Sequence, residues 1–154
     1  MERHEKLVKD YFVKNGIIFQ QSITSARFIK GKWFAQRNDI FSAFDFMIAV
    51  NGDKFILIQV TSNTNSTNRK SKIIDNFINK VETLYNDCNY NIYLLLYKKK
   101  SNRIVWKLIK ANRITINCFK WVDLTEWCKL EEVFAPMQIF EKKEKNKHDV
   151  IKWE

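Results

Sequence analysis

Residues 38–62 read NDIFSAFDFMIAVNGDKFILIQVTS, and this stretch decides the fold. Two apolar runs flank the dipeptide Asn51-Gly52. Asn-Gly between hydrophobic runs is a strong signal for a β-hairpin, because both residues tolerate positive φ. The sequence therefore predicts two antiparallel strands, over about residues 46–50 and 54–61.

The polar residues of this hairpin lie at the ends of its strands. If the connecting loop has three residues, 51–53, then Asp45 lies directly opposite Gln59, whereas a two-residue loop would place it opposite Ile58. Side chains alternate across a strand, so Gln59 and Thr61 share one face. A carboxylate, an amide and a hydroxyl at the end of an apolar hairpin form a candidate metal site.

Length and composition indicate one domain with a polyanionic partner. The chain has 154 residues, of which 45% are apolar and 14% aromatic, which is ample for a single core. We expect a domain over residues 1–140 and a charged tail over 141–154. The net charge of +10 favours nucleic acid over a membrane surface. A ribosomal or architectural protein would share this charge, so the charge alone does not indicate catalysis.

Targeting and cysteine content indicate a cytoplasmic protein. Met1 leads into a charged segment, which predicts no signal peptide, and no apolar run approaches the length of a membrane span. The cysteines form no Cys-x-x-Cys pair, and the chain has two histidines, which argues against structural zinc. Free thiols fit a reducing, intracellular compartment.

An amphipathic helix is predicted over residues 2–15, ending at Asn15-Gly16. Its apolar stripe consists of Leu7, Val8, Tyr11 and Phe12. Glu5 lies along this inward stripe. It either complements the helix dipole as an ordinary first-turn acid or contributes to the hairpin site.

A second helix is predicted over residues 72–86, with Ser71 as its N-cap. The preceding residues, 62–72, contain no apolar side chain and predict an irregular segment. Three cations lie at this junction: Arg69, Lys70 and Lys72. Free backbone N–H groups, the helix dipole and these cations would together favour a phosphate.

Residues 22–38 alternate cations with aromatic residues, and two interpretations stay open. The segment contains Arg27, Lys30, Lys32 and Arg37 together with Phe28, Trp33 and Phe34. Such a segment suits nucleic acid, with cations on phosphates and rings such as Trp33 on bases. The alternative is an ordinary hairpin with aromatic core residues and solvated lysines.

The remaining elements complete an α/β pattern. A short strand is predicted over 17–19, and further strands over 91–97, 104–109 and 113–119. A basic turn over residues 98–103 separates the strands predicted at 91–97 and 104–109. A short capped helix is expected from Asp123. The chain contains no Gly-rich phosphate loop, Gly-x-Ser-x-Gly or His-Glu-x-x-His motif.

This order of elements resembles the PD-(D/E)xK nuclease superfamily, and within it the archaeal-type Holliday junction resolvases. Glu5 matches the family's helix glutamate, Asp45 matches its hairpin aspartate, and Gln59-Val60-Thr61 stands where Glu-x-Lys belongs. The chain is also similar to phage and prophage nuclease-like proteins that read Asp-Leu-Phe-Gly-x-x-Asp and then Gln-Val-Thr-Ser. The corresponding segments here are 39–45 and 59–62, and the resemblance covers roughly residues 1–97.

The resemblance implies a restriction-endonuclease-like mixed sheet flanked by helices, and a DNA endonuclease that depends on Mg²⁺ or Mn²⁺. In the resolvase-like members it also implies action on branched DNA and a symmetric homodimer. Glu5, Asp45 and Gln59 would be the metal ligands, and Thr61 would position the attacking water. The cations and Trp33 described above would bind DNA.

Two departures from the family pattern leave a different function open. Gln59 is neutral and Thr61 carries no ammonium, so the site has one carboxylate fewer and no strand lysine. Asp39 would restore the carboxylate count if the fold brings it close, and Lys70 or Lys72 would supply a cation. The main alternative is a catalytically inactive DNA-binding module on the nuclease fold. A basic interaction protein, in which these polar residues are merely structural, is a third interpretation.

Overall fold

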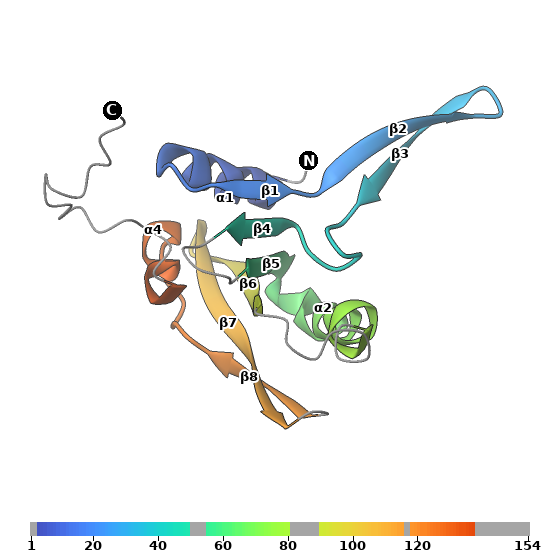
Figure 1. The fold of residues 1–154 in the computed structure, drawn as a ribbon. Helices are drawn as coiled ribbons and strands as arrows, with labels where there is room; N and C mark the ends of the chain where they lie inside the picture. The colour runs from blue at the N-terminus through green and yellow to red at the C-terminus, as the bar shows by residue number, and fades with distance from the viewer. Residues whose placement is uncertain (1–2, 50–54, 81–89, 116–117, 138–154) are drawn as a thin grey trace, which may run out of the picture.

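The computed structural model of the protein describes residues 3–49, 55–80, 90–115 and 118–137 (Figure 1). Its centre is a six-stranded sheet in the order β1-β4-β5-β6-β7-β8, in which β5 and β6 are parallel and every other neighbouring pair is antiparallel. Helices cover both faces, so the prediction of an α/β domain with a mixed sheet is confirmed.

The strands of this sheet are β1 (Phe19–Gln21), β4 (Phe46–Ala49), β5 (Phe55–Ser62), β6 (Tyr90–Lys100), β7 (Arg103–Thr115) and β8 (Cys118–Asp123). A separate two-stranded sheet consists of β2 (Ile23–Ile29) and β3 (Lys32–Asn38). The helices are α1 (Arg3–Lys14), α2 (Ser66–Ile73) and α4 (Leu130–Val133), with shorter helical turns η1 (Asn63–Asn65), η2 (Ile74–Ile78) and η3 (Ala135–Met137).

The hairpin β4–β5 has the register expected for a three-residue loop. Phe46 pairs with Ile58 and Ala49 with Phe55, and the ladder ends at Phe46. Asp45 directly precedes this ladder and Gln59 directly follows it, as the three-residue loop predicts. The loop itself lies outside the described residues. The faces also alternate as predicted, since Ile56, Ile58 and Val60 join one hydrophobic core and Leu57 joins the other.

Helix α1 covers the sheet face that carries Ile58. Val8 and Phe12 are fully buried there, whereas Leu7, predicted to lie in the same stripe, is 37% exposed. The helix ends where Gly16 adopts φ +68° and the Ile17 N–H donates to the Phe12 carbonyl over 3.0 Å. This is the left-handed termination that favours glycine.

Helix α2 begins earlier than predicted. It runs from Ser66, and η2 continues it, so the predicted start at residue 72 and the N-cap at Ser71 are wrong. The first two turns are polar because they lie beside a polar pocket rather than on the core, and the first fully buried side chain is Ile73. Apolar periodicity therefore could not detect this part of the helix.

Three smaller predictions also differ from the structure. The strand expected at 17–19 lies at 19–21, and the strand expected at 113–119 is instead split between the end of β7 and the start of β8. Strand β7 continues through Lys110 and Asn112 because these polar residues alternate with Ile109 and Ala111, which pack on the core. No helix begins at Asp123, which ends β8.

The hairpin β2–β3 projects away from the six-stranded sheet (Figure 1). Its turn uses Lys30 and Gly31, both with positive φ. Trp33 is 72% exposed, Phe28 61% and Phe34 51%. The segment is thus a hairpin, but its aromatic residues are not core residues.

Two expectations concern the ends of the chain and the membrane. The charged tail predicted over 141–154 lies outside the described residues. Within the described ranges, no helix combines the length and apolar character needed to cross a membrane.

Candidate metal and nucleic-acid site

A polar pocket of about 530 Å³ lies where β5 ends. All four residues predicted to be catalytic line it, and they come from three separate segments: α1, the residue before β4, and β5. They are Glu5, Asp45, Gln59 and Thr61. Each is almost completely buried, with 1–4% of its surface exposed. Buried polar side chains are costly unless they are paired or bind a ligand.

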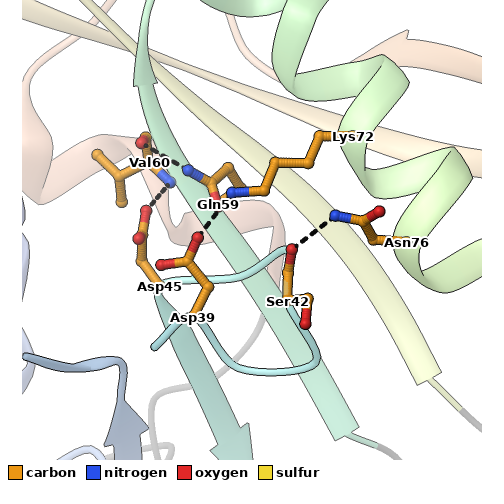
Figure 2. A network of polar contacts seen from close by, with 7 residues as sticks. All are labelled: Asp39, Ser42, Asp45, Gln59, Val60, Lys72 and Asn76. Atoms are coloured by element: carbon orange, nitrogen blue, oxygen red, sulfur yellow. Dashed lines mark hydrogen bonds and ion pairs between the residues drawn. The ribbon is translucent and has the colours of Figure 1, made fainter. Parts of the chain in front are cut away.

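The Asp45 carboxylate is held by backbone groups of β5. Its Oδ2 accepts a hydrogen bond from the Val60 N–H over 2.8 Å (Figure 2). The backbone N–H of Asp45 donates to the Ile58 carbonyl over 2.9 Å. A charge-assisted bond of this kind fixes the orientation of the carboxylate.

Gln59 contains an unsatisfied buried oxygen. Its Nε2 donates to the Val60 carbonyl over 3.2 Å, but its Oε1 has no hydrogen-bond partner among the described residues. Leaving a buried acceptor unpaired costs about 1–3 kcal/mol. An amide oxygen is a usual ligand of hard cations, so this atom fits either a cation or a hydrogen-bond donor from outside the protein.

Glu5 lies in the first turn of α1 and is 3% exposed. Both positions that the sequence suggested for Glu5 are present. It lies in the first helical turn, where a carboxylate complements the helix dipole, and it also lines the pocket. An acid that served the dipole alone would be expected at the solvent surface. Its carboxylate is buried in the same pocket as Asp45 and Gln59.

Asp39 also lines the pocket, on the loop between β3 and β4. It forms an ion pair with Lys72, with 2.8 Å between Oδ2 and Nζ (Figure 2). The loop is further attached to η2 by Asn76, whose Nδ2 donates to the Ser42 carbonyl over 2.9 Å. Phe41 and Ser42 both adopt positive φ, and Ser42 stands where the phage-type pattern has glycine.

The cations of α2 are divided by the helix. Arg69 and Lys72 line the pocket, whereas the Lys70 ammonium lies 5.7 Å from the centre of the Trp121 ring. Because the helix begins at Ser66, these residues lie in its interior and last turn. The prediction that they stand at a helix N-terminus is therefore wrong, and any phosphate affinity must come from their side chains.

Sequence reasoning missed Tyr97, which lines the pocket from β6. The pairing of Ser62 with Tyr97 brings the ends of two parallel strands to the same edge of the sheet. His4 stacks on Tyr97, with ring centres 3.6 Å apart. The signal was present, since two successive apolar runs separated by a helix predict parallel strands that end side by side.

The number of carboxylates in the pocket is consistent with a weak cation site. Within the described parts of the chain, no three His, Cys, Asp or Glu side chains come close enough together to hold a metal ion by themselves. A cation in this pocket would need oxygen atoms from Gln59, water or a bound phosphate to complete its coordination.

The projecting hairpin is joined to the pocket at its base. The Ser22 N–H donates to the Asp45 carbonyl over 2.8 Å, and Asp39 follows directly after β3. Four of the five hairpin residues predicted to bind DNA have described side chains: Arg27, Lys30, Lys32 and Trp33. Arg37 pairs with Thr24 in the register, and its side chain lies outside the described part.

Comparison of the chain with protein-family models, with curated proteins and with solved structures finds no match. The function is therefore argued from the geometry of the pocket and of the hairpin.

Proposed function

We propose that the protein is a metal-dependent DNA endonuclease with a restriction-endonuclease-like arrangement, acting on branched or otherwise structured DNA. The observation that carries this proposal is the meeting of Glu5, Asp45, Gln59 and Thr61 in one pocket beside two cations. These residues come from segments up to 56 positions apart in sequence, and each is buried without an apolar role. The net charge of +10 supports a polyanionic substrate.

The donor set fits Mg²⁺ or Mn²⁺. Asp45 would be the principal ligand, with Glu5 and the Oε1 of Gln59 as further ligands, direct or through water. The unsatisfied buried Oε1 supports this assignment, because a cation would relieve its lost hydrogen bond. The chemistry supplied by a bound Mg²⁺ or Mn²⁺ is polarisation of a phosphate oxygen and activation of water.

The other pocket residues would bind and orient the substrate. Thr61 and Arg69 both line the pocket. In this proposal the Thr61 hydroxyl would orient a water molecule, and the Arg69 guanidinium would bind a phosphate through two N–H groups. Lys72 brings a second positive charge, which its ion pair with Asp39 keeps at the pocket. In this arrangement Asp45 is held by the Val60 N–H before any ligand arrives, and such preorganisation reduces the cost of reaching the transition state.

A second candidate function is a DNA-binding module that does not cleave. It is favoured by the neutral side chains of Gln59 and Thr61, and by the absence, within the described residues, of three acids close enough to hold a metal. Both proposals assign the same DNA-binding surface to the protein, and they differ in whether the protein cleaves DNA. A test of cleavage therefore separates them.

The deciding experiment compares the parent protein with the variant Gln59→Glu/Thr61→Lys. Both are assayed for nicking of linear, single-stranded and four-way DNA, with Mg²⁺, with Mn²⁺ and with a chelator. We expect metal-dependent cleavage by the parent, and tighter cation binding with at least equal cleavage by the double variant, because a carboxylate is a better ligand than an amide for a hard cation. Asp10→Asn, which removes an exposed acid of α1, is the matched control and should change neither property.

Two results would change the conclusion. A parent that is inert in every condition, with cleavage only in the double variant, would establish the non-cleaving module. If neither protein cleaves DNA or binds metal, the pocket is not a metal site and the nuclease proposal fails. Sedimentation of the parent, alone and with DNA, would test the symmetric homodimer that resolvase-like proteins form.

A further inference from the structure

The hairpin β2–β3 has two faces of different chemistry. On one face Phe28 and Trp33 are cross-strand partners, with ring centres 5.1 Å apart and both side chains more than half exposed. The neighbouring position on that face is Ala26, whose small side chain leaves the rings open to a flat ligand. Exposed aromatic pairs of this kind are unusual on a surface without a partner.

Three cations whose side chains are described lie on the opposite face and at the turn. Arg27 pairs with Phe34, and Lys32 pairs with Ile29, so each cation lies beside an exposed apolar side chain. Lys30 adds a cation at the turn. Residues 22–38 contain no Asp or Glu, so the whole ribbon is complementary to a polyanion that also has flat apolar surfaces.

We infer that this hairpin binds unpaired nucleotides, stacking Phe28 and Trp33 on bases while Arg27, Lys30 and Lys32 bind phosphates. In a continuous duplex each base face is covered by its neighbours, so a ring outside the helix finds no base to stack on. In an unpaired strand the base faces are accessible, and aromatic stacking is the main attraction that single-strand binding proteins use. The inference rests on the proposed function for the nature of the polymer, and names the substrate class of that site.

The geometry also sets the distance between this contact and the pocket. Asn38 ends β3 next to Asp39 of the pocket, and Trp33 lies five residues before Asn38. At about 3.4 Å per residue, the aromatic pair lies roughly 17 Å from the base of the hairpin. Along stacked duplex DNA this length corresponds to about five base pairs, so a nuclease of this design would cut the duplex about five base pairs from the unpaired segment.

The test measures binding by fluorescence anisotropy in a chelator, so that it does not depend on cleavage. The probes are a closed duplex, the same duplex with a central bubble, and the single strand. We expect the full-length parent to bind bubble and single strand more tightly than duplex. Phe28→Ala/Trp33→Ala should weaken those two complexes by roughly 10-fold or more and the duplex by less than about 2-fold.

Two further variants control this experiment. Phe55→Ala removes a half-exposed aromatic residue from the far end of β5 and should change no complex. Lys30→Ala/Lys32→Ala should weaken all three complexes, because phosphate contacts do not depend on pairing.

Several outcomes would overturn the inference. One is that Phe28→Ala/Trp33→Ala weakens duplex binding and bubble binding equally. Another is that this variant binds every DNA probe as tightly as the parent does. Self-association of the parent that disappears in the double variant, with DNA binding unchanged, would assign the hairpin to contact with a second copy of the chain. A parent that binds bubble DNA as expected but never cleaves would leave this inference standing while the nuclease proposal fails.

Discussion

The strongest single test of the pocket is the pair of substitutions Asp45→Asn and Asp45→Ala. Asp45 is 1% exposed and accepts the Val60 N–H over 2.8 Å. Asparagine retains one oxygen that can accept from the Val60 N–H, but it loses the negative charge and has an NH₂ group in place of the other oxygen. Alanine also leaves the Val60 N–H buried without a partner.

The structure gives an expected magnitude for each variant. An unsatisfied buried donor costs about 1–3 kcal/mol, which for a domain of this size lowers Tm by roughly 3–10 °C in Asp45→Ala. Asp45→Asn should cost about 1 kcal/mol, less than Asp45→Ala, because its amide oxygen keeps the Val60 N–H paired. The two variants therefore separate the structural role of the side chain from the role of its charge.

Metal binding provides the functional readout. For the parent with Mg²⁺ at about ten times its Kd, mass action adds about 1.4 kcal/mol to the stability, or roughly 3–5 °C in Tm. Asp45→Asn should lose this increment and all cleavage, and its DNA affinity should be equal or slightly higher because a negative charge near phosphate is removed. Thermal melting with Mg²⁺ or chelator, together with the nicking assay, measures both effects. Asp45→Asn with an undiminished Mg²⁺ increment, or with cleavage close to that of the parent, would refute the metal site.

Three other substitutions, two of them with a comparison variant, test the pocket, the loop beside it and the hydrophobic core. Arg69→Ala should weaken binding to every DNA sequence and reduce the slope of log K against log salt by about 0.9, with a smaller change for Lys70→Ala; a slope equal to that of the parent would contradict the Arg69 assignment. Ser42→Gly should raise the free energy of unfolding by about 0.5–1 kcal/mol, measured with urea, because Ser42 has φ +60°. Phe12→Ala, at a fully buried ring, should cost about 3–5 kcal/mol, whereas Phe55→Ala at an exposed ring should cost less than about 1 kcal/mol.

The centre of the fold was predictable because local signals and burial agree there. The apolar runs on both sides of Asn51-Gly52 predicted the hairpin and left two registers open, and the structure has the one expected for a three-residue loop. A shift by one residue would move Ile56 and Ile58 out of one core and Gln59 into it. Register is strongly determined when both faces of a strand are buried in this way.

The start of α2 was not predictable from the same kind of signal. Apolar periodicity detects the part of a helix that packs on a core, and in this helix that part begins at Ile73. The residues from Ser66 to Lys72 face a polar pocket and solvent, so their pattern is typical of a loop. The first two turns of α2 are helical because of their position in the tertiary structure and not because of the helix propensity of their residues.

The candidate site was predictable in its residues and less so in its contacts. The sequence indicated Glu5, Asp45, Gln59 and Thr61, and all four line one pocket. Neither the contribution of Tyr97 nor the ion pair of Asp39 with Lys72 was predicted, because both depend on elements that are brought together by the sheet and by the early start of α2.

Gln59 and Thr61 stand where the nuclease family that the chain resembles has Glu and Lys, and the effect on charge is best considered for the two positions together. Relative to a Glu-x-Lys strand they remove one negative and one positive charge, so the formal charge of the segment is unchanged. Positions 59 and 61 are 3% and 4% exposed, and charges at such depth are costly to desolvate even when paired. The pocket instead contains an acid and a lysine at its edge, Asp39 and Lys72, whose side chains are 14% and 33% exposed. An ion pair there is less expensive to form and remains accessible to a phosphate. In the proposed site, this ion pair at the edge supplies the charged groups that the buried strand positions lack.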